Sequence, residues 1–288
     1  MRLPGVSAAS FSPVSDAVAV LFDDGVLQVR HGDLVSLEVA TGLFGMQGPR
    51  HAWSPDGRHI LAADAASLQV RDAASGALVS SWEAPMGWLG TSWSPDGRHI
   101  ASGGEGGCAI WEPLSGQRLH RLLPAEPDVA VTWTAWSSDA ARLAAGILLA
   151  DDSAEVRIWD ARTGQRLRVI AGLCWGSTAC WRADGRHILA HCEESGRVQE
   201  IDAASGQVRR GVEVRDDHDN TVLDWHPTQP IAATGGADGA VTLWDLDSGR
   251  RLHRLQAHAE GIHHVEFRTD GSRLLSIADD DTVHIQTF

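Results

Sequence analysis

The sequence contains no Lys, no Tyr and a single Asn (Asn220) among its 288 residues, so all 24 basic side chains are Arg. The scarce residues have AT-rich codons, and the pattern therefore indicates a GC-rich, bacterial-like genome. With 38 acidic side chains, the formal net charge is -14. Nucleic acids and anionic membrane surfaces are bound mainly through basic side chains. We therefore expect neither as a partner, whereas a protein or peptide, preferably a basic one, remains compatible.

Long apolar runs are also missing. No stretch of 18 apolar residues predicts a membrane-spanning helix, and residues Met1 to Gly5 carry no apolar core of a secretion signal. The four cysteines form no C-x-x-C pair, which disfavours a zinc or redox site and favours small buried side chains in a reducing, cytoplasmic setting. The acidic run from Asp279 to Asp281 lacks the calcium-loop pattern. The sequence predicts no cofactor and no metal site.

A repeat of 40 to 45 residues determines the expected fold. The segment from Trp53 to Ile100 contains the same eight letters twice, at Trp53–Ile60 and Trp93–Ile100, and weaker copies occur elsewhere. The aromatic anchors of the seven copies are Phe11, Trp53, Trp93, Trp136, Trp181, Trp225 and Phe267. The copies read as short strands, four in a complete unit, with a Pro-Asp-Gly type turn and, in five copies, a Ser/Thr-Gly turn, and none shows helical periodicity. This period is typical of propeller blades. We therefore predict an all-β, seven-bladed propeller that occupies residues 1–288 as one domain.

The ends of the third strands carry a family resemblance. Trp159-Asp160 and Trp244-Asp245 resemble the endings that give the WD40-repeat proteins their name, and Trp111-Glu112 is a near match. The resemblance covers essentially the whole chain. It implies a protein-interaction scaffold or sensor module that binds a partner on one face of the ring.

The resemblance also implies a hydrogen-bonded network within a blade, made by His, Ser or Thr, Asp and Trp. Unit 6 offers Thr234, Asp238 and Trp244. Its His218 lies two residues closer to the anchor Trp225 than the corresponding histidine of unit 7 lies to Phe267. Unit 7 offers His258, Ser276 and Asp280, with Gln286 where Trp is expected. Units 2, 3 and 5 depart further. We assign structural roles to these network residues and to the strand-end tryptophans Trp111 and Trp159.

Ring closure is the feature that the sequence leaves open. Unit 7 supplies three strands, and only Met1 to Pro4 precede the first strand expected at Gly5–Phe11. Blade 7 is therefore either three-stranded, with Met1 to Pro4 as a short stub or with a solvated edge, or completed by a natural N-terminal extension or by a strand of a partner. An exposed strand edge is normally covered.

The strand order places two sets of loops on one face, named here the top face: those before each first strand and those after each second strand. The loops after the second strands hold twelve carboxylates, which predict an acidic rim. The apolar loop expected at Ile147–Ala154 is another candidate contact. The predicted partner-binding residues of the top face are Met46, Arg50, Trp88, Trp133, Trp175, His218, Asn220, His263, His264, Glu105, Asp151 and Asp152.

No carboxylate pair, glycine-rich loop or nucleophile arrangement stands out as catalytic, so we predict no catalytic residues and a non-enzymatic role. Two alternatives remain open. One is an enzyme of TolB-like, peptidase-like or other propeller type with a site in the central channel. The other is a structural subunit of a fixed assembly.

Overall fold

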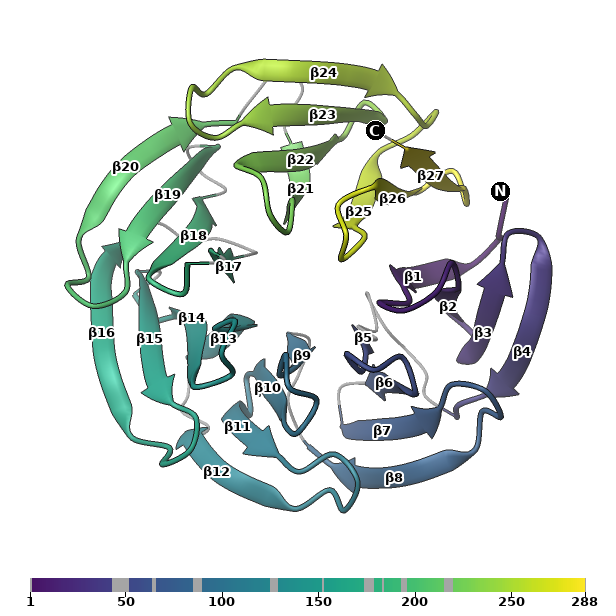
Figure 1. Ribbon diagram of the computed structural model, residues 1–288, viewed down its shortest axis with the longest axis horizontal. Helices are drawn as coiled ribbons and strands as arrows, with labels where there is room; N and C mark the ends of the chain where they lie inside the picture. Colours follow the sequence, from purple (N-terminus) through teal and green to yellow (C-terminus); the bar gives the residue numbers. More distant parts are fainter. Residues whose placement is uncertain are drawn as a thin grey trace.

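The computed structural model describes residues 2–42, 52–63, 66–84, 90–124, 129–151, 153–173, 179–182, 184–192, 196–214 and 220–287. Within these ranges every regular element is a β-strand. The strands form seven small antiparallel sheets arranged in a ring (Figure 1). The predicted all-β, seven-bladed propeller is therefore confirmed.

Strands follow one another from the axis to the rim within each blade (Figure 1). Blades 1 to 3 comprise β1 (Val6–Phe11), β2 (Val18–Phe22), β3 (Val26–His31), β4 (Leu34–Ala40); β5 (Ala52–Trp53), β6 (His59–Ala63), β7 (Ser67–Asp72), β8 (Leu78–Glu83); and β9 (Thr91–Trp93), β10 (Ile100–Gly104), β11 (Gly107–Trp111), β12 (Arg118–Leu123). Blades 4 and 5 comprise β13 (Ala130–Trp136), β14 (Arg142–Leu148), β15 (Ala154–Asp160), β16 (Arg166–Leu173); and β17 (Ala179–Trp181), β18 (His187–Cys192), β19 (Arg197–Asp202), β20 (Val208–Glu213). Blades 6 and 7 comprise β21 (Asn220–Trp225), β22 (Ile231–Gly236), β23 (Ala240–Asp245), β24 (Arg251–Gln256); and β25 (Ile262–Phe267), β26 (Arg273–Ala278), β27 (Val283–Thr287).

Local sequence explains the tight turns at the lower end of the blades. After the anchor Trp53, the Ser54 hydroxyl donates to Asp56 at 2.6 Å and accepts the backbone amide of His59 at 2.9 Å. Gly57 then adopts a φ of 69°, which a residue with a side chain rarely takes. Asp72 caps the next turn by accepting the amide of Ser75 at 2.8 Å. Side-chain caps thus satisfy backbone groups that the strands leave unpaired.

The core lies between adjacent blades. Side chains of the three inner strands of one blade pack against those of the next, as Leu275, Ile277 and Val283 of blade 7 do with Phe11 and Val20 of blade 1. Outer strands such as β4 alternate between exposed and half-buried positions. Burial of apolar area between blades therefore stabilises the ring, because a single sheet covers neither of its own faces.

Blade 7 has three strands among the described residues, as one sequence alternative predicted. The start of the chain closes only its upper end. Arg2 forms an antiparallel bridge with Thr282, and the Leu3 amide donates to the Asp281 carbonyl at 2.7 Å. Leu3 is buried in the cluster between blades 7 and 1. Blades 7 and 1 lie side by side at this junction (Figure 1).

Candidate functional site

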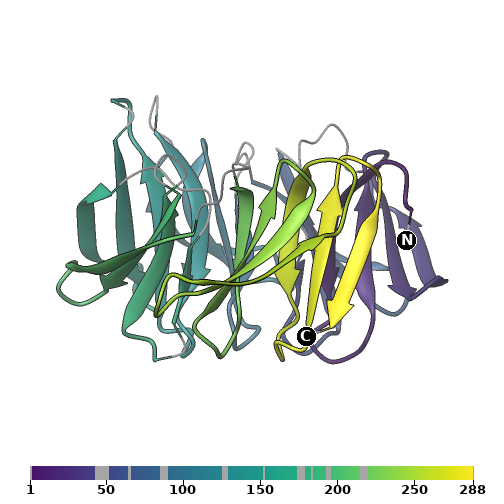
Figure 2. The same ribbon diagram turned by 90° about the horizontal axis from the view of Figure 1, so that it is seen from above.

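The top face, which points upward in Figure 2, is acidic in its described part. None of the described residues in the loops after the second strands is basic. The carboxylates of these loops are Asp23, Asp24, Glu105, Asp151, Asp238, Asp279, Asp280 and Asp281. By contrast, Arg side chains occur on the outer strands and lower turns, as Arg118 and Arg166 do. Charge is thus distributed unevenly between the faces.

Half of the predicted partner-binding residues lie outside the described residues: Met46, Arg50, Trp88, Trp175, His218 and Asp152. Asn220 begins β21, where only its backbone is described. Glu105 and Asp151 are exposed on the top face, as expected. His263 is exposed beside the half-buried His264, whose Nε2 lies 3.5 Å from the Glu266 carboxylate.

Two predicted contacts prove to be part of the core. Trp133 lies within β13 and is 5% exposed, so it offers almost no surface to a partner. Trp133 pairs with Gly146 across the β13–β14 ladder, and its indole lies against that glycine. A Cβ atom at Gly146 would lie 2.3 Å from the indole nitrogen, so a side chain there would clash with the ring. The loop expected from Ile147 is also shorter than predicted. Strand β14 continues to Leu148, and Ile147 is 1% exposed.

The predicted network forms in pieces. In blade 6 the Trp244 indole donates to the Thr234 hydroxyl at 2.9 Å, and in blade 3 the Trp111 indole donates to Ser102 at 2.6 Å. Asp238 accepts the Ala240 amide and forms an ion pair with Arg254. These bonds satisfy buried donors that would otherwise be costly.

Blade 4 contains the tryptophan of this network but not its hydroxyl. In blade 4, Trp159 is 1% exposed and packs with Trp136 and Leu143. Ala145 occupies the place that Thr234 has in blade 6, so this position lacks the hydroxyl that pairs with an indole in blades 3 and 6.

In blade 7 the network contains one residue that the sequence reading missed. His258 Nε2 lies 2.8 Å from the Ser276 hydroxyl, and its Nδ1 lies 2.6 Å from the Thr282 hydroxyl and 3.4 Å from Asp280. Partial burial alone would raise the pKa of Asp280, but hydrogen bonds from Thr282 and the Ala259 amide outweigh it and lower the pKa to about 2. Thr282 follows the acidic run directly, which is a local signal for such a cap.

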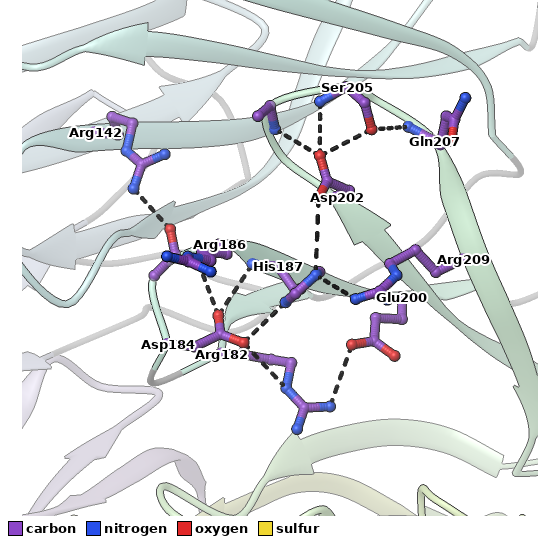
Figure 3. A network of polar contacts seen from close by, with 12 residues as sticks. Arg142, Arg182, Asp184, Arg186, His187, Glu200, Asp202, Ser205, Gln207 and Arg209 are labelled. Carbon is purple, nitrogen blue, oxygen red and sulfur yellow. Dashed lines mark hydrogen bonds and ion pairs between the residues drawn. The ribbon is translucent and has the colours of Figure 1, made fainter.

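A second polar cluster, which sequence reasoning missed entirely, lies at the lower end of blade 5 (Figure 3). Arg182 reaches Glu200 at 3.4 Å and Asp184 at 4.0 Å. His187 Nδ1 lies 2.8 Å from Asp184, and Arg209 donates to His187 Nε2 at 2.8 Å. Since Nε2 accepts that bond, the proton of the neutral ring is on Nδ1 and is donated to Asp184.

The sequence signal for this cluster is substitution within the repeat. Arg182 occupies the position that Ser holds after the anchors of blades 1 to 4. Glu200 occupies a third-strand position where Ile110 and Ile158 are fully buried. The charged side chains border an open pocket of about 470 Å³, but they pair with one another. The cluster therefore mainly holds the segment between β17 and β18 against strands β18, β19 and β20.

Two carboxylates join neighbouring blades near the axis. Asp224 accepts the Phe267 amide at 2.6 Å, and Glu266 accepts the Phe11 amide at 3.1 Å. Burial, with a smaller contribution from the nearby Glu266, raises the pKa of Asp224 to about 7. A carboxyl with this pKa suits acid–base chemistry, but here one of its oxygens is already bound to the backbone.

The described residues show neither a metal site nor a helix that could span a membrane. No group of three or more His, Cys, Asp or Glu side chains is placed to hold a metal ion there. The same part of the chain contains no helix long and apolar enough to cross a membrane.

Comparison with known proteins identifies the repeats. The family model "WD domain, G-beta repeat" matches residues 78–112, 212–245 and 249–285. Each match runs from the outer strand of one blade into the third strand of the next. The chain therefore contains WD40 repeats in a seven-bladed propeller.

Curated relatives resemble parts of the chain. Eukaryotic translation initiation factor 3 subunit I of Pyricularia oryzae is 38% identical over 66 residues, which are 23% of this chain and 19% of that protein. An uncharacterised WD repeat-containing protein of Schizosaccharomyces pombe is 25% identical over 180 residues, 59% of this chain and 44% of the relative. Apoptotic protease-activating factor 1 of Mus musculus is 26% identical over 161 residues, 48% and 12%. The chain thus spans less than half the length of each of these eukaryotic relatives.

Proposed function

We propose that the protein is a non-catalytic interaction platform that binds a basic segment of a partner protein on its acidic top face. The observation that carries this proposal is the lack of described basic side chains beside the carboxylates of the loops after the second strands. Exposed carboxylates such as Asp24, Glu105 and Asp151 lie in the loops after the second strands, whose described residues include no basic side chain. Opposite charge speeds the encounter of two proteins and selects against partners of like charge.

Similarity to proteins that contain WD40 repeats supports a role in binding proteins. One relative is named as a subunit of a translation initiation factor, which fits a role within an assembly. A cytoplasmic location and a bacterial-like origin remain part of this proposal, the latter from composition alone. The raised pKa of Asp224 is explained by its place between blades, so we do not assign it a catalytic role.

Binding of a fluorescent peptide made of alternating Arg and Ser residues tests the proposal. The double variant Glu105→Gln/Asp151→Asn removes two charges from the top face, and Asn at position 151 can still accept the Ser153 amide. The matched control Asp33→Asn/Asp247→Asn removes two exposed charges from the lower turns of blades 1 and 6.

We expect the top-face variant to slow peptide association several-fold and to weaken its dependence on salt, because exposed charges act within a Debye length of about 10 Å at 0.1 M salt. The control should behave like the unmodified protein. Equal effects of the two double variants would contradict a top-face site.

A further inference from the structure

The edge of β27 differs from the corresponding strand of every other blade. We propose that this edge, together with the turn of blade 1 beside it, is a docking slot for one extended segment of a separate polypeptide, which adds as the fourth strand of blade 7. The slot lies on the side of the ring and is separate from the acidic top face. It therefore goes beyond the function proposed above, and either idea can fail without the other.

Exposure of Ile285 is the first observation. Ile285 faces Leu275 across the β26–β27 ladder and is 41% exposed. The residues at the same position in the other blades are Val29, Val70, Ile110, Ile158, Glu200 and Leu243, and none is more than 9% exposed. In those six blades a fourth strand lies beside the third. Ile285 thus occupies a position that is buried in the other blades, but no fourth strand of blade 7 covers it among the described residues.

The turn of blade 1 provides an independent observation. In blades 2 to 6 the glycine of the turn between third and fourth strands touches the outer strand of the preceding blade. A methyl group at Gly76 would lie 3.1 Å from Leu37, and one at Gly164 would lie 2.8 Å from His120. Blade 1 has a shorter turn of two residues at this place, and nothing lies within 4 Å of a methyl group at its Gly32. The preceding blade is blade 7, so this empty contact marks the place of the same absent strand.

Blade 6 borders the slot on its other side. Leu255 on β24 is 39% exposed, whereas Leu123 and Ile170 at the same position of blades 3 and 4 are each 4% exposed. By analogy with Val39, which lies against Gly76 of the following blade, Leu255 faces blade 7. The exposed side chains of Ile285 and Leu255 and the open position at Gly32, on three different blades, therefore all border the edge of β27.

The shape of the slot selects the occupant. Strands β24 and β4 lie farther from the ring axis than β27, so the edge is recessed between two neighbours (Figure 1). A second folded copy of the ring cannot bring a strand to a recessed edge, whereas a single extended segment can. Arg2 already bridges Thr282 at the upper end. The open part of the edge is thus Val283–Thr287, which fits a segment of about five residues in an antiparallel ladder.

The six fourth strands that are present define the chemistry of the segment. The residue opposite the position of Val283 is apolar in all of them: Val39, Trp82, Leu123, Ile170, Val212 and Leu255. The residue opposite the position of Ile285 varies and is Leu37, Ser80 or His120 in the first three blades. We therefore expect a segment with an aliphatic or aromatic residue opposite Val283 and a tolerant position two residues away.

A synthetic peptide with the sequence of residues 33–41, Asp-Leu-Val-Ser-Leu-Glu-Val-Ala-Thr, is a suitable probe. It is the fourth strand of blade 1, with Leu37 and Val39 at the two inward positions, and its net charge of -2 keeps it from an acidic face. Amide hydrogen exchange of the 288-residue chain, with and without the peptide, reports the edge directly. We expect the peptide to slow exchange in Val283–Thr287 at least about tenfold and to leave the β22–β23 ladder unchanged.

Two variants make the outcome decisive. The peptide with Val39→Asp and the protein with Ile285→Asp should each lose the protection, and the exposed position of Ile285 lets the protein variant keep its fold, as unchanged exchange in β23 would verify. Absence of protection, or protection that survives both changes, would overturn the proposal. So would exchange of Val283–Thr287 that is already as slow as that of Val241–Trp244 without peptide, or protection that grows with protein concentration alone, which would indicate a second copy.

Discussion

The carboxylate of Asp224 in blade 6 accepts a hydrogen bond of 2.6 Å from the backbone amide of Phe267 in blade 7. The anchors Trp53, Trp136 and Trp181 instead donate their indole N–H to a carbonyl of the preceding blade. Phe267 has no such donor. The carboxylate supplies the connection between the blades at this position, and the same arrangement joins Glu266 to Phe11.

Asp224 should make stability depend on pH in an unusual direction. Its pKa rises from 3.8 to about 7 on folding, mainly through burial. Between these values the folded protein binds more protons than the unfolded chain, so this group's contribution falls as pH rises and is lost above about pH 7. Asp224→Asn keeps an acceptor for the Phe267 amide and removes the titration. The gain in melting temperature of this variant over the unmodified protein should grow from pH 4 to pH 7 and then stay constant.

Glu266→Gln provides the control for that experiment. Glu266 is one of the groups that raise the pKa of Asp224. Its neutralisation should move the midpoint of the pH effect to a lower value. A gain from Asp224→Asn that is the same at every pH would contradict the assignment.

The repeat made the fold predictable from sequence. Seven anchors at nearly equal spacing determine the number of blades, and the caps at Asp56 and Asp72 act within a few residues of their own position. The three strands that unit 7 supplies to blade 7 followed from counting, whereas the way in which the ring closes did not. These features depend on local chemistry, which a sequence displays directly.

Contacts between strands and between blades were harder to predict. Burial of Trp133 depends on Gly146 across the ladder, and a large residue near a strand start reads equally well as a loop contact. The bond from Asp224 to the Phe267 amide spans two blades, so only the closed ring shows it. Much of the predicted top-face site lies outside the described residues and stays a prediction.

The bond between Trp244 and Thr234 should contribute measurably to stability. Thr234→Val keeps the shape of the side chain and leaves a buried indole N–H without its acceptor, which costs about 1–3 kcal/mol. Denaturant unfolding should show this loss. A double-mutant cycle with Trp244→Phe isolates the bond, because the second change should cost less once Thr234 has been replaced. Strict additivity of the two changes would show that the bond contributes nothing.

The charged pair in blade 5 should be replaceable only as a unit. Glu200→Leu leaves Arg182 without its partner at 3.4 Å and should destabilise the protein by about 1–2 kcal/mol, since the pair is only partly shielded from water. The double variant Arg182→Ser/Glu200→Leu restores the residue types of blades 1 to 4 and should recover most of that loss. Thermal unfolding of the three proteins measures this, and a double variant less stable than Glu200→Leu would contradict it.

Blade 7 should gain stability from the aromatic residue that its repeat lacks. Gln286 occupies the position of Trp244, and its buried amide nitrogen and oxygen both lack hydrogen-bond partners among the described groups. The Ser276 hydroxyl faces His258, whose pKa is lowered by burial and which therefore favours its neutral form. A hydroxyl that donates to a neutral ring can still accept a bond from an indole.

Gln286→Trp should therefore stabilise the protein by about 1 kcal/mol, which corresponds to a rise of about 2–4 °C in melting temperature for a chain of this size. Gln286→Phe is the matched control, because it supplies a ring without an N–H donor and should give a smaller gain. Calorimetry at one pH near neutrality compares the two. Equal melting temperatures for the two variants would show that the hydroxyl does not accept the new bond, and a decrease in both would show that the space beside Leu274 is too small for a ring.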